Sequence, residues 1–191
     1  LLMVDDSHGV GVLGPHGEGT AHQLGANKGV DIIMGSFTKA FGSLGGFVTV
    51  NETLSQYLRI TARSYIFSDP IPPAFVAGLL TSLELVQRGD GLRKSALGNS
   101  SKLREGLKAL GFRVLGEFST IVPLLTGDEQ KAMKFASLLT EKKILAPCIR
   151  KPAVDNGKER IRFSVMASHE SQHIDRLLES CEEIGKTLSI I

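Results

Sequence analysis

The chain of 191 residues is long enough for one large domain or for two smaller ones. Hydrophobic residues make up 42% and charged residues 22% of the sequence, as is usual for a globular protein. The 22 basic and 20 acidic side chains leave a formal net charge of +2, so charge gives no reason to expect nucleic acid as a partner. The apolar runs are too short to span a bilayer, and we expect a cytoplasmic protein, with the mitochondrial matrix or a membrane-associated complex as alternatives.

Neither the cysteines nor the beginning of the chain indicates a secreted protein. Cys148 and Cys181 lie far apart without CxxC spacing, which favours free thiols over a disulfide or a metal site. The sequence begins without Met and with an apolar, strand-like segment over residues 1–4. We therefore expect a fragment of a longer protein.

The first half of the chain has the pattern of a buried sheet with helices. Short, continuously apolar segments predict strands over residues 1–4, 30–34 and 47–50. Such segments are typical of a sheet that is covered on both faces, as in the α/β class. Asn51 is expected to cap a helix that follows it, and residues 65–67 predict a further strand.

Further helices are expected from the middle of the chain onward. Pro73 is suited to the first turn of a helix that extends to residue 86, and a long amphipathic helix over residues 92–110 is expected to end at Gly111. The rest of the chain predicts strands over residues 112–115, 120–125, 145–149 and 160–165, and helices over 128–143 and 169–188. This second region has the pattern of a small α+β domain.

Lys39 is the residue that points most directly to chemistry. It follows an apolar strand-like segment and precedes a glycine-rich turn, where an ordinary solubilising lysine is poorly placed. It is well placed to form a Schiff base, and Asp5 and His8 follow another apolar segment from which they could hold the ring of such an adduct. This combination indicates pyridoxal phosphate (PLP) as the cofactor.

Several motifs resemble one enzyme family. Residues 5–11, 14–19, 35–46, 66–74 and 160–169 together resemble the α-oxoamine synthases, which are fold-type I PLP-dependent enzymes. This family includes serine palmitoyltransferase, 8-amino-7-oxononanoate synthase, 2-amino-3-ketobutyrate CoA ligase and 5-aminolevulinate synthase. The resemblance covers nearly the whole chain but only the C-terminal half of a family member.

The resemblance implies a fold and a domain organisation. We expect an α/β, fold-type I PLP-dependent transferase fold. Residues 1–97 would form the C-terminal part of the large, mixed-sheet PLP-binding domain, and residues 98–191 the small α+β C-terminal domain.

The resemblance also implies roles for single residues. Lys39 corresponds to the lysine that carries PLP and then acts as base and acid at the substrate's α-carbon. Asp5 corresponds to the partner of the protonated pyridine nitrogen, and His8 to the donor to the cofactor's phenolic oxygen. Asp6 competes with Asp5, but adjacent strand residues face opposite ways, and the family register selects Asp5.

The remaining candidates concern the phosphate and the substrate. Ser36 and Thr38 correspond to phosphate-binding positions, and Ser68 to a position that reaches the phosphate of the neighbouring subunit. Arg162 corresponds to the arginine that clamps the substrate carboxylate. We expect alternation along the strand to point the nearby Arg160 elsewhere.

Two positions depart from the family pattern, and no metal site is expected. Asp69 stands where the family has a Ser/Thr-rich segment near the phosphate, and Glu18 stands where many members have Arg.

The implied enzyme is an acyltransferase of biosynthesis. It would condense an amino acid with an acyl-CoA, usually with loss of carbon dioxide, to give an α-amino ketone, as a homodimer with the site at the subunit interface. The Phe-Thr-Lys form of the lysine motif favours the serine palmitoyltransferase branch.

Two alternatives belong to other classes. One is a non-catalytic or truncated homologue that retains the fold for dimerisation. The other is a dinucleotide-binding protein, because Gly9, Gly11 and Gly14 fit G-x-G-x-x-G after a strand. That fingerprint requires a helix to open at the glycines, whereas Pro15, Gly17 and Gly19 follow them here.

Overall fold

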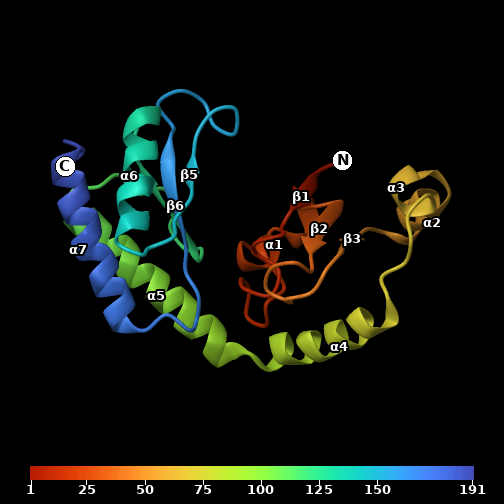
Figure 1. Ribbon diagram of the computed structural model, residues 1–191. Coiled ribbons are helices and arrows are strands. Elements are labelled where there is room, and N and C mark those ends of the chain that lie inside the picture. Colours follow the sequence, from red (N-terminus) through yellow and green to blue (C-terminus); the bar gives the residue numbers. More distant parts are fainter. The chain divides into compact units, whose positions relative to one another are not determined.

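The computed structural model describes residues 1–191, which form two compact units, Leu1–Arg93 and Lys94–Ile191 (Figure 1). Their boundary lies within the helix α5, a few residues before the expected domain boundary at residue 97. No helix of the chain combines the length and the apolarity needed to cross a bilayer. Both units contain strands and helices, and each is described separately below.

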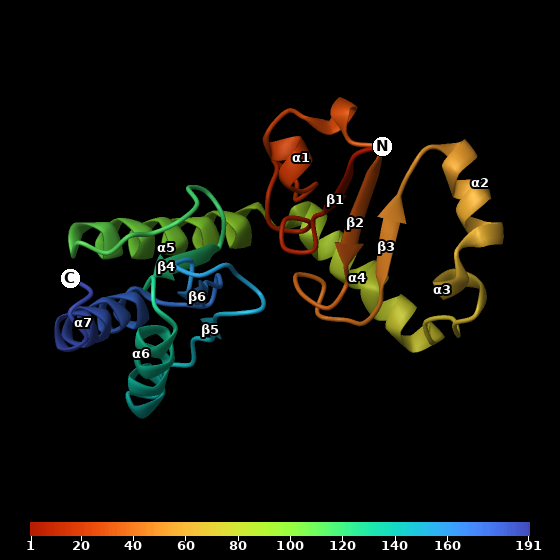
Figure 2. The same ribbon diagram turned by 90° about the horizontal axis from the view of Figure 1, so that it is seen from above.

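The first unit contains a three-stranded sheet in the order β1-β2-β3 (Figure 2). Its strands are β1 (Met3–Asp5), β2 (Ile32–Ser36) and β3 (Gly46–Thr49). β1 and β2 are parallel, whereas β2 and β3 are antiparallel. The three expected strands are therefore confirmed, with β2 shifted two residues toward the C-terminus relative to the predicted range 30–34.

The helices of the first unit lie between and after these strands. They are α1 (Thr20–Gln23), the 3-10 helix η1 (Asn27–Gly29), α2 (Glu52–Thr61), α3 (Arg63–Ile66) and α4 (Pro73–Arg88). Asn51 caps α2 as expected, since its side chain accepts a hydrogen bond from the Leu54 N–H. Figures 1 and 2 both show α4 along one side of the sheet, and its Ser82 hydroxyl donates to the Phe41 carbonyl at 3.0 Å.

The prediction of a strand at residues 65–67 is wrong. The segment forms the helical turn α3 instead, in which the Ile66 N–H donates to the Ala62 carbonyl and the Phe67 N–H to the Arg63 carbonyl. A three-residue apolar run has no period of its own, so these local hydrogen bonds decide its conformation.

The second unit is built on an antiparallel sheet in the order β4-β6-β5. Its elements are α5 (Asp90–Ala109) from Lys94 onward, β4 (Ile121–Leu125), α6 (Glu129–Glu141), β5 (Cys148–Ile149), β6 (Arg160–Ser164) and α7 (Ser171–Thr187). Gly111, with φ +98°, follows α5 as expected. Of the strand expected at residues 112–115, only a single bridge from Val114 to Leu124 forms.

An apolar core holds the second unit together. α6 contacts α7, β5 and β6, so helices and sheet share one interior. Leu103, Leu107, Phe135, Leu139 and Ile161 are fully buried within it. Because these side chains come from two helices and a strand, the core fixes the sheet that carries Arg162 on β6.

Candidate functional site

Two polar segments lie at one edge of the first sheet. Asp5 is the last residue of β1, and Lys39 lies in the turn that follows Ser36, the last residue of β2. Parallel pairing places Asp5 opposite Met34, so both strands end at the same edge. In α/β sheets this carboxyl edge is where ligands bind.

The carboxylate of Asp5 is exposed and favours its ionised form. Ser7 donates two hydrogen bonds to Oδ1, one from its hydroxyl at 2.5 Å and one from its backbone N–H at 3.0 Å. These hydrogen bonds lower the pKa of Asp5, and the positive charges of Lys39 and His8 lower it further. Lys39 and His8 therefore lie close enough to Asp5 to act on its charge.

Asp6 faces the opposite way, as the alternation of side chains along a strand requires. It is only 4% exposed, and its two oxygens accept from the Thr20 N–H at 2.6 Å and the Thr20 hydroxyl at 2.5 Å. The competition between the two aspartates is thus decided by geometry. Asp5 faces the exposed edge, whereas Asp6 anchors the start of α1.

Glycines make room for the Asp6 carboxylate. A Cβ at Gly9 would lie 2.0 Å from Oδ1, and a Cβ at Gly19 would lie 2.1 Å from Oδ2. The backbone N–H groups of Gly9 and Val10 also donate to the Asp6 carbonyl. The loop between β1 and α1 is therefore closed around this one side chain.

The same loop does not meet the requirement of the dinucleotide fingerprint. No helix opens at Gly9 or Gly11. The Gly11 N–H donates instead to the Gly17 carbonyl, and the first helix, the four-residue α1, begins only at Thr20. A phosphate-binding helix N-terminus of the Rossmann type is thus absent from this position.

Hydroxyl groups lie beside Lys39. The Ser36 Oγ is 2.8 Å from the Thr38 Oγ1 and accepts from the Thr38 N–H at 3.2 Å. Lys39 and Thr38 are exposed, and Ser36 is half-buried. These donors and the lysine form a group suited to an anion.

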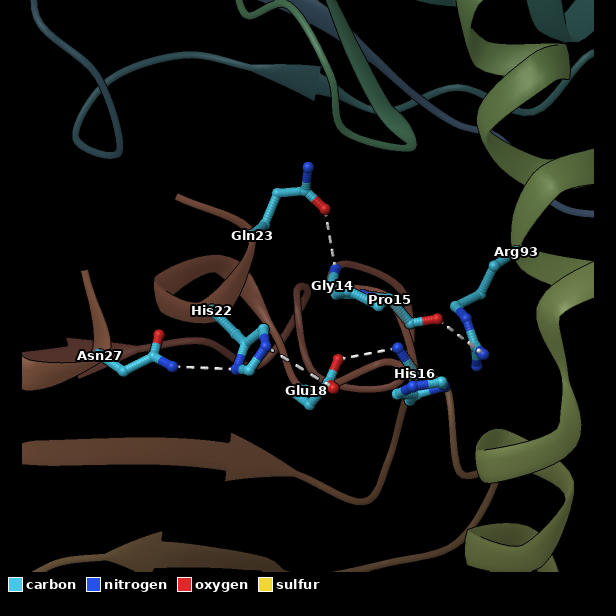
Figure 3. Close-up of polar contacts among 8 residues, drawn as sticks. All are labelled: Gly14, Pro15, His16, Glu18, His22, Gln23, Asn27 and Arg93. Carbon is cyan, nitrogen blue, oxygen red and sulfur yellow. Dashed lines mark hydrogen bonds and ion pairs between the residues drawn. The ribbon is translucent and has the colours of Figure 1, made fainter. Parts of the chain in front are cut away.

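Glu18 closes the far end of the glycine loop (Figure 3). Its Oε2 accepts from the His16 N–H at 2.8 Å, and its Oε1 lies 3.8 Å from the His22 Nε2. Burial raises the pKa of Glu18, but hydrogen bonds from the backbone N–H groups of His16 and Glu18 outweigh this and lower it. The His22 ring also contacts the Asn27 amide at 2.9 Å. Glu18, which departs from the family pattern, thus fixes the loop.

Arg93 holds the same loop from α5 (Figure 3). This buried guanidinium donates to the carbonyl groups of Pro15 and Val86 and forms an ion pair with Asp90. Gln23 adds a hydrogen bond to the Gly14 N–H at 3.0 Å. Polar contacts therefore fix the loop at several points, and with it the end of β1.

Ser68 is not brought to the Lys39 turn by any hydrogen bond. Its hydroxyl donates to the Ser64 carbonyl at 2.6 Å, at the end of α3, and both Ser68 and Asp69 are exposed.

Arg162 lies in the second unit on β6, paired with Pro123 of β4. The expectation that alternation separates it from Arg160 is wrong, because residues two apart on a strand share a face, here opposite the buried Ile161. Their contacts distinguish them. The Arg160 Nε donates to the Lys158 carbonyl, whereas the buried Arg162 Nε has no acceptor in the chain.

Comparison with known proteins now decides the family. A model of the family described as aminotransferase class I and II matches residues 1–180. The chain belongs to this family.

Relatives within the aminotransferase class I and II family carry two names. An 8-amino-7-oxononanoate synthase of Citrifermentans bemidjiense is 39% identical over 100% of this chain and 50% of its own length. A serine palmitoyltransferase of Bacteriovorax stolpii is 38% identical over 99% of this chain and 45% of its own. The expected resemblance is confirmed, and the chain spans about half the length of the curated relatives it matches.

Solved structures of the family agree on the fold. A structure of SPT (serine palmitoyltransferase) with a PLP internal aldimine matches with a TM-score of 0.91 and 30% identity, over 100% of this chain and 48% of that chain. The expectation of an α/β, fold-type I fold is thereby confirmed.

Sequence reasoning did not assign a role to Ser7 or Thr20. A serine two residues after an aspartate is a known signal for a local side-chain hydrogen bond, so the contact between Ser7 and Asp5 could have been found. The contact between Thr20 and Asp6 closes a 14-residue interval and has no such local signal.

Proposed function

We propose that this member of the aminotransferase class I and II family is part of a PLP-dependent acyltransferase that condenses an amino acid with an acyl-CoA. The observation that carries the proposal is the placement of an exposed Asp5, whose lowered pKa favours the carboxylate, at the same sheet edge as the turn that contains Lys39. The relatives named 8-amino-7-oxononanoate synthase and serine palmitoyltransferase, and the PLP-bound SPT structure, support it.

The residues present fit the cofactor. Asp5 offers an anionic oxygen for a protonated pyridine nitrogen, and Ser36 and Thr38 offer hydroxyl groups for a phosphate. Bound PLP supplies an electron sink for the negative charge that develops at the amino acid's α-carbon.

Each residue at the edge has a distinct task. Lys39 holds the cofactor through Nζ and later removes and returns the proton at the substrate's α-carbon. Asp5 keeps the proton on the pyridine nitrogen, because a fixed negative charge favours the cationic ring. His8 donates to the phenolic oxygen of the cofactor.

Two further contacts complete the proposal. Ser36, Thr38 and Ser68 serve the phosphate. Arg162 binds the substrate carboxylate, which supplies an acceptor for guanidinium donors such as its unpaired, buried Nε–H.

The whole enzyme is proposed to be a cytoplasmic homodimer with its site at the subunit interface. Residues 1–97 belong to the large PLP-binding domain, and residues 98–191 form the small domain. The reaction joins the α-carbon of the amino acid to the acyl carbon of the thioester and releases CoA, and in most members also carbon dioxide. The serine palmitoyltransferase branch remains our first choice, on the Phe-Thr-Lys form of the lysine motif.

The test uses the full-length protein mixed with PLP. A visible absorption band is expected, and borohydride should bleach it and leave the cofactor covalently attached to the peptide that contains Lys39. Lys39→Ala should abolish both results, whereas Lys28→Ala, which changes a lysine of η1, should change neither. If the full-length protein binds no PLP, the enzyme proposal fails and the non-catalytic homologue takes its place.

The branch is decided by the substrates. Alanine, glycine and serine are added separately, and the one that perturbs the absorption band and also releases CoA from an acyl-CoA is the substrate. Serine with palmitoyl-CoA is the expected pair. Turnover of alanine or glycine, with none of serine, would overturn this choice while leaving the acyltransferase proposal intact.

A further inference from the structure

Ser7 donates two hydrogen bonds to a single oxygen of Asp5. Its hydroxyl lies 2.5 Å and its backbone N–H 3.0 Å from the Oδ1 of Asp5, and neither donor is bonded to Oδ2. Ser7 itself is only 8% exposed, whereas Asp5 is exposed. The buried Ser7 thus holds one oxygen of the exposed Asp5 carboxylate by hydrogen bonds.

Met34 restricts the Ser7 hydroxyl from the adjacent strand. Its Sδ lies 3.1 Å from the Ser7 Oγ, and Met34 is also the residue opposite Asp5 in the parallel pair β1–β2. A hydroxyl has one proton, and a carboxylate oxygen is a much stronger acceptor than a thioether sulfur. The proton therefore goes to Asp5, while the thioether occupies the space into which the hydroxyl could turn.

A carboxylate is planar, so fixing Oδ1 also fixes the direction of Oδ2. We propose that Ser7 is a positioning residue which holds Asp5 by Oδ1 so that Oδ2 is presented to the protonated ring nitrogen of the cofactor. This inference rests on the proposed function and deepens it. Nothing in the resemblance or in the relatives assigns a role to this serine.

The charges around Asp5 agree with this role. The hydrogen bonds from Ser7 are the largest cause of its lowered pKa, and the positive charges of Lys39 and His8 act in the same direction. Loss of the hydroxyl should therefore move the pKa of Asp5 upward. The backbone N–H of Ser7 remains in any variant, so the local turn is retained and only the side-chain contact is removed.

The test compares three variants of the full-length protein. Ser7→Ala removes the hydroxyl, Ser7→Thr retains it, and Ser82→Ala is a matched control, because the half-buried Ser82 donates its hydroxyl to a backbone carbonyl of the same unit. Binding of PLP is measured by titration. We expect about tenfold weaker binding for Ser7→Ala, the size of one hydrogen bond to a charged group, and unchanged binding for the other two.

A second readout does not need the cofactor. The Asp5 carboxylate is titrated by carbon-13 NMR in PLP-free protein, where Ser7→Ala should raise its pKa toward the ordinary value and Ser7→Thr should leave it low. Ser7→Ala should also have no further effect on PLP affinity when Asp5→Asn is already present, because the serine acts through that carboxylate.

The outcomes separate the two proposals. If wild-type protein binds no PLP, the proposed function fails, and the positioning role in cofactor binding fails with it even where the NMR shift is seen. If wild-type protein binds PLP but Ser7→Ala binds it equally well, only the positioning role is overturned. If Ser82→Ala lost as much affinity for PLP as Ser7→Ala, the effect of Ser7→Ala would be a general structural one, and the positioning role would be overturned.

Discussion

The two units of the chain are stabilised by different means. In Lys94–Ile191, side chains such as Leu107 and Phe135 form a continuous apolar core. In Leu1–Arg93 the buried apolar residues are only Leu13, Ala21 and Phe41. The buried polar residues of this unit are Asp6 and Ser7, which follow β1, and Arg93 on α5. The proposed cofactor site around Lys39 and Asp5 lies in the first unit, Leu1–Arg93. Its geometry depends on directional hydrogen bonds more than on apolar packing.

The sequence supplies a separate reporter for each unit. The chain has no Trp and two Tyr, and both Tyr57 and Tyr65 lie in the first unit, so tyrosine fluorescence follows that unit. Cys181 is a buried free thiol in the second unit, so its labelling by a thiol reagent follows the unfolding of that unit. The predictions on the core, the polar anchor and the helix caps are measured in urea with both reporters.

The largest effect is expected in the apolar core. Phe135→Ala should lower the free energy of unfolding of the second unit by about 3–5 kcal/mol, because a fully buried aromatic ring is replaced by a cavity. Cys181 should become reactive at lower urea. Met133→Ala, at an exposed position of the same helix, should change stability by less than about 0.5 kcal/mol. Similar effects of the two variants would show that no tight core exists.

A smaller effect is expected at the polar anchor of the first unit. Asp6→Asn should cost about 2 kcal/mol, because an amide oxygen can replace only one of the two acceptors that bind Thr20 and the charge is lost. Tyrosine fluorescence should report the change, whereas Cys181 labelling should not. Asp69→Asn, at an exposed position, is the control. If Asp6→Asn had no effect, the contrast between the units would lose its basis.

Helix caps offer a matched pair, one in each unit. Asn51 accepts from the Leu54 N–H at 2.9 Å and Asp128 from the Lys131 N–H at 2.8 Å. Asn51→Ala and Asp128→Ala should each cost about 1 kcal/mol. Each loss should be detected by the reporter of its own unit. A loss seen by both reporters for either variant would mean that the two units unfold as one.

The smallest effect at neutral pH concerns Cys181. Burial raises the pKa of its thiol to about 12, from an ordinary value of 9.0. A raised pKa of an acid in the folded state contributes stability that is complete below pH 9 and is lost as pH rises toward 12. The second unit should therefore weaken in this alkaline range, as followed by circular dichroism. Cys181→Ala should remove this part of the pH dependence, and an unchanged profile would contradict it.

The sequence predicted those features that depend on local patterns. The continuously apolar segments located β1, β2 and β3, and Asn51 and Gly111 marked helix ends because capping is a property of a few adjacent residues. Local pattern was insufficient for the apolar run at residues 65–67, whose hydrogen bonds reach back to Ala62 and Arg63 and form α3.

The candidate site divides in the same way. Lys39 and Asp5 were found because each follows an apolar segment, and the parallel pairing of β1 and β2 was the fact needed to bring them to one edge. Contacts between segments that are far apart in the sequence could not be predicted from it. The Thr20 hydroxyl donates to Asp6, and the Arg93 guanidinium donates to the Pro15 carbonyl. Both hydrogen bonds depend on tertiary structure, which the periodicity of the sequence does not predict.

The position of the buried Asp6 carboxylate limits which substitutions the loop between β1 and α1 can accept. The Asp6 carboxylate fills the space in which a side chain at Gly9 or Gly19 would begin, although these glycines are ten residues apart. A side chain at either position would therefore clash with the Asp6 carboxylate, and at Gly19, with φ +112°, it would also strain the backbone. Gly29 has open space around its Cβ position. Sequence change in the loop is thus coupled to a residue whose side chain faces away from the reacting groups.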